Sequence, residues 1–247
     1  MISAVILTKN EEENIKECLA GVKWCDEILV IDDDSSDKTR EIAEEEGSKV
    51  IRHSLAGDFA AQRNYALSLS KGDWVFFVDA DERVSPELAQ EIQEAIKNPN
   101  IDGFYLKRID FFMGKWLKHG EIRSVKLLRL AKRQSGFWQR SVDELWEIKG
   151  NTSVLKNPLL HYSHPELKQF LSTINERTTL NAKEFYEKRV RVTFLEWLKP
   201  LAKFIKNYFL LLGFLDGTSG LVFAVMMSLH SFMVRGKLYL LWQKNEK

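Results

Sequence analysis

The chain has few of the features that define several large classes of protein. Its 247 residues include only two cysteines, Cys18 and Cys25, which form neither a CxxC pair nor a zinc-ligand pattern. This excludes a disulfide-stabilised scaffold and a structural cysteine-zinc site, and we expect two reduced cytosolic thiols. There is also no internal repeat and no low-complexity segment, which excludes a solenoid and a disordered linker protein.

Long apolar runs are also scarce. Residues 217–234 carry no formal charge, but glycine, serine and histidine interrupt them. The dense apolar part, 221–234, is shorter than the roughly 20 residues that a membrane span needs. Met1 is followed directly by the apolar run Ile2–Leu7, without a basic segment or a cleavage site, so we expect no signal peptide. We therefore expect a cytoplasmic protein.

Net charge is nearly absent, at +1, but the two parts of the chain differ in sign. Residues 1–100 carry 11 Lys and Arg against 22 Asp and Glu, whereas residues 101–247 carry 25 against 13. An acidic part is able to hold a metal, and a basic part suits phosphates or an anionic membrane surface. We expect no nucleic-acid partner.

Strand-like and helix-like segments alternate through the first hundred residues. The apolar runs at 2–7, 28–31, 49–52 and 75–78 alternate with helical patterns at 11–19, 38–46, 59–69 and from Ser85-Pro86 onward. This alternation predicts an α/β fold with a mostly parallel sheet flanked by helices. Short aromatic and basic β-like runs at 103–109, 125–130 and 137–148 predict an antiparallel extension of that sheet.

The last part of the chain has a helical pattern, at 167–186, 194–208 and 221–242. We therefore expect two domains, an α/β domain at 1–164 and a helical extension at 165–247. The segment 194–208 has aromatic and apolar residues on one face and Lys199, Lys203 and Lys206 opposite. This pattern favours a helix that lies on anionic lipid at the inner face of the cell membrane. Packing against the core or a second subunit is the alternative, so an oligomer is possible.

Three acidic clusters follow predicted strands, at Glu11–Glu13, Asp32–Asp37 and Asp79–Glu82. Because the carboxyl ends of parallel strands share one edge of the sheet, we expect the clusters to converge. Asp79 and Asp81 directly follow the apolar run 75–78, and nothing about packing requires them there. Two carboxylates brought together need a cation, most often a divalent metal. A solvated loop is the alternative for Glu11–Glu13.

These residues, in this order and spacing, resemble family 2 glycosyltransferases of the GT-A fold. The matching segments are Ile2–Asn10 with the following Glu11, Asp32-Asp33 with Ser35 and Asp37, Gln62-Arg63-Asn64, and Val78-Asp79-Ala80-Asp81. Within that family the chain is most similar to the bacterial lipopolysaccharide-core β-glucosyltransferase type. In that type the QRN and DADE motifs recur together with a Gly-Phe-Leu-Asp-Gly segment, here Gly213–Gly217. The resemblance is strong over residues 1–150.

The resemblance implies a nucleotide-diphosphate sugar as donor, a UDP type above all, and Mg²⁺ or Mn²⁺ as cofactor. Donor binding falls on Thr8, Asn10, Glu11, Asp32, Asp33, Arg63 and Asp79. Within that set, Asp33 matches the family position whose carboxylate contacts the edge of the nucleotide base. Arg63 matches the position whose guanidinium supports the donor or a neighbouring acid. Asp81 matches the position of the direct metal ligand, and Asp79 matches a position near the ribose or the metal. His161 is a further candidate metal ligand.

Three further points depend on single residues. Inverting transfer needs a base, and the family position falls on Val142-Asp143-Glu144, where we favour Glu144 and keep Asp143 as the alternative. Asp34 replaces the glycine of the usual Asp-Asp-Gly-Ser order, and Asp tolerates the left-handed region that this loop needs. Arg123, Lys126 and Arg129 are candidates for contact with a diphosphate, although an exposed strand face explains them equally well.

The sequence therefore predicts a metal-dependent inverting glycosyltransferase that moves a hexose to a lipid-linked saccharide such as the lipopolysaccharide core. A polyprenyl-phosphate glycosyltransferase is the nearest alternative. A phosphohydrolase with an Asp-x-Asp nucleophile motif is a second, although that motif belongs on a first strand. A non-catalytic membrane module that binds nucleotide sugars is the third.

Overall fold

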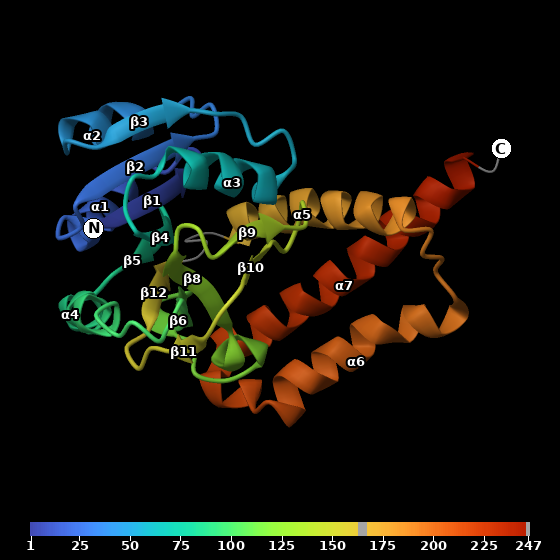
Figure 1. The fold of residues 1–247 in the computed structure, drawn as a ribbon. Helices are drawn as coiled ribbons and strands as arrows, with labels where there is room; N and C mark the ends of the chain where they lie inside the picture. Colours follow the sequence, from blue (N-terminus) through green and yellow to red (C-terminus); the bar gives the residue numbers. More distant parts are fainter. Residues whose placement is uncertain (163–166, 246–247) are drawn as a thin grey trace. The chain divides into compact units, whose positions relative to one another are not determined.

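The computed structural model describes residues 1–162 and 167–245, which group into two compact units (Figure 1). The first unit contains Met1–Arg108 and Val125–Tyr162, and the second contains Ile109–Ser124 and the chain after residue 162. The domain boundary that we expected between residues 164 and 165 lies outside the described residues. The segment 109–124 groups with the second unit.

A mixed sheet forms the centre of the first unit, as the sequence predicts. The strand order is β3-β2-β1-β4-β8-β6-β12-β5, and β1 to β4 are mutually parallel. β8 runs antiparallel to both β4 and β6, which confirms the antiparallel extension for 103–109 and 125–130. The predicted extension at 137–148 is wrong, because these residues pair with each other in a separate two-stranded sheet. The bounds are β1 Ile2–Thr8, β2 Glu27–Asp32, β3 Lys49–Arg52, β4 Trp74–Asp79, β5 Glu82–Arg83, β6 Gly103–Phe112, β8 Lys126–Lys132, β11 Thr152–Val154 and β12 Leu159–Tyr162.

Apolar layers cover both faces of this sheet. On one face Ile6, Phe76 and Val78 pack with residues of α1 (Ile15–Val22), α2 (Thr39–Glu45) and α4 (Pro86–Ala95). On the other face Val5 and Phe77 pack with residues of α3 (Phe59–Leu69) and of a separate two-stranded sheet, β9 (Gly136–Gln139) with β10 (Leu145–Ile148). Because successive strand residues alternate between faces, β4 is buried on both sides.

The local signals in the sequence explain where two of the helices begin. Ser85 Oγ accepts a hydrogen bond from Leu88 N at 3.2 Å and Pro86 occupies the first turn, so α4 begins where we predicted. α1 begins four residues later than the predicted start at Glu11. Asn10 has φ 54°, and the N–H of Glu11 donates to Thr39 Oγ1 at 2.7 Å instead of entering a helix.

Cys18 and Cys25 are both free thiols.

The second unit combines a short hairpin with the C-terminal helices. The far end of β6 pairs with β7 (Lys115–Trp116), and the 3₁₀ turn η1 (Glu121–Ser124) follows. A core of Phe112, Leu117 and Ile122 packs with residues of α5 (Leu167–Glu187) and α7 (Gly217–Asn245). α7 lies beside both α5 and α6 (Lys199–Ile205) in Figure 1. The segment Gly213–Lys244 is long and apolar enough to cross a membrane, by length and composition only.

The predicted helix at 194–208 is present but irregular. A 3₁₀ turn, η2 (Phe194–Leu198), leads into α6, and a π turn, η3 (Lys206–Leu210), follows. The 3₁₀ turn η4 (Gly213–Asp216) then joins this segment to α7. A side chain at Gly213 would place its Cβ 2.5 Å from the carbonyl oxygen of Asn207, so only glycine fits between the π turn and α7.

Candidate active site

The acidic clusters converge at one edge of the sheet, as the strand pattern predicts. In the parallel register Thr8 lies beside Asp32, and Leu7 lies beside Asp79, so β1, β2 and β4 end together. The loop after β2 turns at Asp34, which has φ 52°. Asp34 therefore occupies the left-handed region that the glycine of the usual motif provides, as predicted.

Two arginines hold Asp79 at the centre of this edge. Arg63 Nη2 donates to Asp79 Oδ1 at 2.9 Å. Arg129 donates from Nη2 to Oδ2 at 2.6 Å and from Nη1 to Oδ1 at 3.3 Å. Burial would raise the pKa of Asp79, but the charges of Arg129 and Arg63 outweigh burial and hold it well below its usual range. Asp79 is therefore an ionised anchor whose two oxygens both have cationic partners.

An aromatic cluster fixes the position of Arg63. Its Cζ lies 4.7 Å from the ring centroid of Trp138 and 5.6 Å from that of Phe77. Trp146 stacks on Trp138 at 5.3 Å, so the guanidinium rests on a packed apolar base. Only 3% of the Arg63 side chain is exposed, and a buried cation of this kind needs ionised partners.

The two candidates for the base have different positions. Arg63 Nε donates to Glu144 Oε1 at 2.9 Å, which links Glu144 to Asp79 through one guanidinium. Burial would raise the pKa of Glu144, but the charges of Arg63 and Arg129 lower it, so Glu144 is ionised at neutral pH. Asp143 is exposed, with φ 51°, on the turn before β10. The structure brings Glu144, and not Asp143, into the arginine network.

The second motif aspartate pairs with a histidine from a distant part of the chain. Asp81 Oδ2 lies 3.0 Å from His161 Nε2, and the N–H of Tyr162 donates to the Asp81 carbonyl at 2.9 Å. Antiparallel pairing of β5 with β12, which places His161 beside Glu82, brings the two together. Burial would raise the pKa of Asp81, but the neighbouring His161 outweighs it, so the pKa lies below its usual value.

The expected nucleoside-binding residues lie around the ends of β1 and β2. Asp33 accepts from Lys9 Nζ at 2.8 Å and from the N–H of Leu55 at 2.7 Å. Asp32 is fully buried and accepts from the N–H of Ser35 at 3.0 Å, which shapes the loop. The remaining two are Thr8, whose buried hydroxyl has no hydrogen-bond partner among the described residues, and Asn10, which accepts from Ser36 N at 2.8 Å.

Glu11 lies within the electrostatic influence of the Asp81 pair. Burial, with a further contribution from Asp81, raises the pKa of Glu11 to about 7. Asn14 Nδ2 donates to its Oε2 at 2.7 Å and opposes this shift. Glu11 therefore changes charge near neutral pH, in contrast to the ionised Asp79 and Glu144.

The sequence did not decide whether Arg129 contacts the site or lies on an exposed strand face, and it assigned no separate role to Glu82. Arg129 lies on β8, is 4% exposed, and has a pKa raised by Asp79 and Glu82 despite its burial. Glu82 is fully buried, accepts from Asp79 N at 2.9 Å, and has a pKa raised first by burial. The available signal for Arg129 was its place as a lone cation in the apolar run 127–131.

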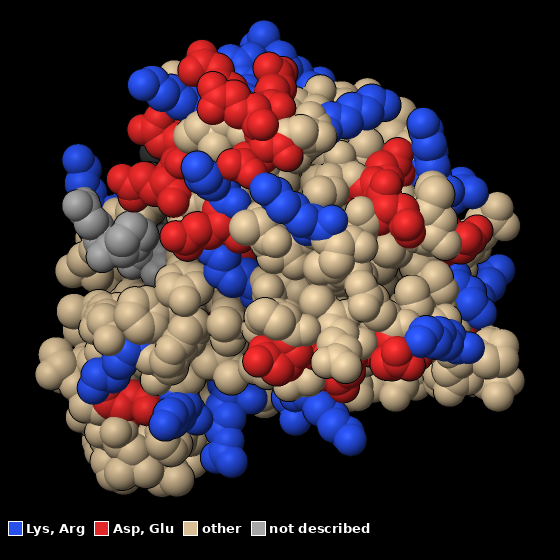
Figure 2. Space-filling model, turned by 90° about the vertical axis from the view of Figure 1, so that its left-hand side faces the viewer, with Lys and Arg blue, Asp and Glu red and all other residues tan. Residues whose placement is uncertain are grey.

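The surface charge of the first unit is locally acidic. Figure 2 shows many Asp and Glu side chains gathered in the upper part of that view, where α2 and β3 lie in Figure 1. By sequence the first unit carries 20 Lys and Arg against 26 Asp and Glu, and the second 16 against 9. The units thus keep the opposite signs that the two parts of the chain suggested, but with a smaller difference.

The fold and the convergent acidic edge define a glycosyltransferase of the GT-A type, and the comparisons agree. The family model "Glycosyl transferase family 2" matches residues 3–151, and the chain belongs to that family. The lipopolysaccharide core biosynthesis glycosyltransferase LpsC of Rhizobium meliloti is 26% identical, over 96% of this chain and 92% of that protein. An uncharacterized glycosyltransferase of Rickettsia typhi is also 26% identical, over 96% of this chain and 86% of that protein.

Solved structures share the fold at low sequence identity. Glucosyl-3-phosphoglycerate synthase of Mycobacterium tuberculosis, in complex with Mn²⁺, UDP-glucose and phosphoglyceric acid, has a TM-score of 0.54 at 15% identity, covering 78% of this chain and 81% of that one. Residues 1–349 of S. aureus TarS have a TM-score of 0.52 at 17% identity, and the match covers 99% of this chain and 91% of that one. The resemblance seen in the sequence and the predicted GT-A fold are confirmed, and the phosphohydrolase alternative is wrong.

Proposed function

We propose that this enzyme transfers a hexose, with inversion, from a UDP-type sugar nucleotide to a lipid-linked saccharide such as the lipopolysaccharide core. The proposal depends chiefly on one observation. At the strand edge, Asp79 has arginine partners on both of its carboxylate oxygens, whereas Asp81 Oδ2 lies 3.0 Å from His161 Nε2. The two motif carboxylates therefore have separate roles, one as an electrostatic anchor and the other as a metal ligand.

The donor atoms of Asp81 and His161 suit a divalent cation. Their side chains are 25% and 13% exposed, so both are reachable from solvent. Among the described residues no group of three or more His, Cys, Asp or Glu side chains is arranged to hold a metal. Mg²⁺ and Mn²⁺ sites of sugar nucleotides usually take one or two protein ligands and complete the shell with phosphate oxygens and water. When bound, such a cation neutralises charge on the leaving diphosphate.

Glu144 is the proposed base. It accepts the proton of the acceptor hydroxyl as that oxygen bonds to the anomeric carbon and the carbon–oxygen bond to the diphosphate breaks. Only Oε1 of Glu144 is engaged by Arg63 within the described part of the chain, which leaves Oε2 for the acceptor. The lowered pKa of Glu144 keeps it ionised, as a base must be.

The choice of acceptor follows from the extent of the similarity. LpsC, named for lipopolysaccharide core biosynthesis, is matched over 92% of its length. The dolichol-phosphate mannosyltransferase of Pyrococcus furiosus is 36% identical, but over only 39% of this chain and 30% of that protein. The similarity to the mannosyltransferase therefore covers less than half of either chain. This difference favours a saccharide acceptor over a polyprenyl phosphate.

We also place the enzyme on the cytoplasmic face of the membrane, as a peripheral protein. The segment Phe194–Leu212 exposes many large apolar side chains, with Phe194 at 81% and Leu210 at 72%. Lys199 and Lys206 are exposed on the same segment. An exposed apolar surface with nearby lysines is typical of helices that lie on anionic lipid.

The test of this function separates binding from transfer. Glu144→Gln retains the hydrogen bond to Arg63 but removes the base, so we expect transfer from UDP-glucose to a lipopolysaccharide-core acceptor to fall by about 10²–10⁴-fold. Stabilisation by UDP with Mn²⁺ should remain close to that of the wild type. Retained turnover in Glu144→Gln would exclude Glu144 as the base, and a parallel Asp143→Asn variant shows whether Asp143 takes that role.

A further inference from the structure

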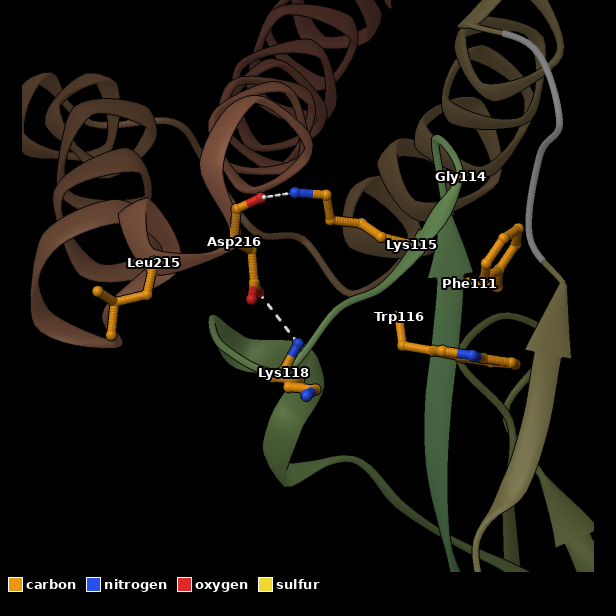
Figure 3. Close-up of a pocket in the computed structure, with 7 residues that line it drawn as sticks. All are labelled: Phe111, Gly114, Lys115, Trp116, Lys118, Leu215 and Asp216. Atoms are coloured by element: carbon orange, nitrogen blue, oxygen red, sulfur yellow. Dashed lines mark hydrogen bonds between the residues drawn. The ribbon is translucent and has the colours of Figure 1, made fainter.

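The second unit contains a pocket of about 530 Å³ that the proposed reaction leaves without a role. Two separate segments form it, the β6–β7 hairpin and the turn before α7 (Figure 3). Its lining combines cationic, acidic, aromatic and apolar side chains: Phe111, Lys115, Trp116, Lys118, Leu215 and Asp216. A mixed concave lining of this kind is typical of a ligand site.

Asp216 holds the two segments of this pocket together. Its Oδ2 accepts from the backbone N–H groups of Lys118 at 3.0 Å and His119 at 2.9 Å, and its Oδ1 lies 2.9 Å from His119 Nδ1. Its carbonyl oxygen accepts from Lys115 Nζ at 3.0 Å (Figure 3). Asp216 is only 6% exposed, and both of its carboxylate oxygens are engaged within the protein.

The hairpin that presents the pocket residues is fixed by its turn. Met113 has φ 48° and Gly114 has φ 81°, and the strand pairs Phe112 with Lys115 and Phe111 with Trp116. A two-residue turn with both φ values positive matches the twist of an antiparallel hairpin. The ring centroids of Phe111 and Trp116 lie 5.1 Å apart, and the ring planes are inclined at 63°. The two rings therefore already contact each other without a ligand.

The lining matches an anionic sugar. Lys118 is exposed and Lys115 uses one of its three ammonium protons on Asp216, which leaves donors for a phosphate or carboxylate. Half-buried aromatic rings offer a flat surface to the apolar face of a sugar. The whole unit carries 16 Lys and Arg against 9 Asp and Glu, so long-range attraction favours an anion as well.

Exposed apolar side chains border this pocket and indicate a ligand that comes from a lipid. Leu215 lines the pocket and is 57% exposed. A neighbouring pocket of about 270 Å³ is lined by Arg123 together with Leu210 and Leu212, and both leucines are exposed. The cations of the two pockets therefore lie on the segment 115–123, and the exposed leucines lie on the segment 210–215. A soluble sugar phosphate would have no use for these leucines, whereas a membrane-borne headgroup would place its chains beside them.

We propose that the pocket between the β6–β7 hairpin and the turn before α7 binds the phosphate- or carboxylate-bearing sugar headgroup of a glycolipid. This inference rests on the proposed function, since it makes the pocket a recognition site for the lipid-linked acceptor. It adds to that function the place where the charged headgroup of the acceptor binds, and it names Lys118 as the cation that recognises it.

The test measures co-sedimentation of the full chain with phosphatidylcholine vesicles that contain lipid A, a phosphorylated glucosamine disaccharide on acyl chains. Vesicles with phosphatidylglycerol at equal charge serve as the comparison. We expect tighter binding to lipid A, and Lys118→Ala should weaken it by about fivefold because one lysine–phosphate contact is lost. Lys118→Arg should retain it. The matched control is Lys183→Ala, which removes an exposed lysine of α5 in the same unit and should change binding less than twofold.

Three results would overturn the inference. One is equal binding of the wild type to phosphatidylglycerol and lipid A vesicles, which would mean a response to bilayer charge alone. Another is an equal loss in Lys118→Ala and Lys183→Ala. The third is binding of soluble glucosamine 6-phosphate as tightly as lipid A. Failure of the proposed function is detected separately. Lys118→Ala should still be stabilised by UDP with Mn²⁺. A wild type that UDP with Mn²⁺ does not stabilise would disprove the donor assignment and leave the lipid A result intact.

Discussion

At the scale of single residues, the two aspartates of Asp79-Ala80-Asp81 have opposite electrostatic surroundings although only one residue separates them. Asp79 faces two guanidinium groups, whereas Asp81 faces an imidazole. A buried guanidinium is permanently charged and holds a carboxylate without being displaced by protonation. An imidazole holds a carboxylate far less strongly than a guanidinium does, so a divalent cation can compete with it for that carboxylate. The two positions thus differ because β8 and α3 bring arginines to Asp79 while β12 brings a histidine to Asp81, and this difference supports the proposed roles of anchor and metal ligand.

The anchor has a measurable effect on stability. Arg129→Met keeps much of the side-chain volume but leaves Asp79 and Glu82 with less cationic compensation in a buried site. Removing one partner of a buried ion pair costs about 3–5 kcal/mol, which lowers Tm by roughly 6–20 °C in a chain of this size. Lys126→Met on the exposed face of β8 is the matched control, and its Tm should stay near that of the wild type. Equal Tm values in the two variants would mean that the arginine adds nothing to the fold.

Glu11 should give the folded protein a pH-dependent stability. Its pKa is about 7 in the folded protein against an ordinary value of 4.5, so between these values the folded state holds more protons than the unfolded state. The resulting stabilisation is complete below pH 4.5 and is lost as pH rises through 7. The Tm of Glu11→Gln minus that of the wild type should therefore increase from pH 5 to pH 8, measured with a chelator present. A difference that stays constant across this range would contradict the assignment.

The residues of the site were predictable from sequence to different degrees. Asp33, Asp79 and Asp81 follow apolar strands, so a parallel sheet had to bring them to one edge, and it does. Arg129 was not assigned, because its burial depends on β8 pairing with both β4 and β6, a tertiary fact that a strand pattern does not contain. Whether Asp81 binds a metal and Glu144 is the base remain predictions.

At the scale of elements, regular segments followed from the sequence more closely than irregular ones. α3 has the predicted bounds Phe59–Leu69, and β3 has the predicted bounds Lys49–Arg52. The segment 194–208 was predicted as one helix, but it contains a 3₁₀ turn and ends in a π turn. The cause lies outside the segment's own pattern: the π turn lies against Gly213, where no side chain fits. Close backbone contacts of this kind leave only a glycine in the sequence as a signal.

This irregular element is also the proposed membrane contact. Phe194→Ser with Leu201→Ser removes two side chains that are 81% and 60% exposed, so the fold should tolerate the change. Each side chain buried in lipid contributes about 1.5–3 kcal/mol, so binding to anionic vesicles should weaken by more than tenfold. Leu145→Ser, which removes an exposed leucine of β10, is the control and should bind as the wild type does. Unchanged vesicle binding together with loss of a dimer in sedimentation would assign the surface to a second subunit instead.

At the scale of the whole molecule, charge and chemistry are distributed between the two units. The first unit is acidic by sequence and contains the proposed donor site, and the second is basic and contains the pocket proposed for an anionic lipid. The sign difference could be predicted from the sequence. The grouping of 109–124 with the second unit could not, because these residues begin within β6, a strand that starts in the first unit, and they join the second unit through contacts with α5 and α7.

The central claim is that Asp81 and His161 hold a divalent cation that binds the diphosphate of the donor. The most direct measurement is the Tm of the full chain with UDP, with and without Mn²⁺. At a hundredfold excess over Kd, UDP should stabilise the wild type by about 2.7 kcal/mol, a rise of roughly 5–10 °C, only when Mn²⁺ is present. Asp81→Ala and His161→Ala should lose this rise, and Glu94→Ala, at an exposed carboxylate of α4, should keep it. Stabilisation by UDP that is the same without metal, or that persists in Asp81→Ala, would contradict the account.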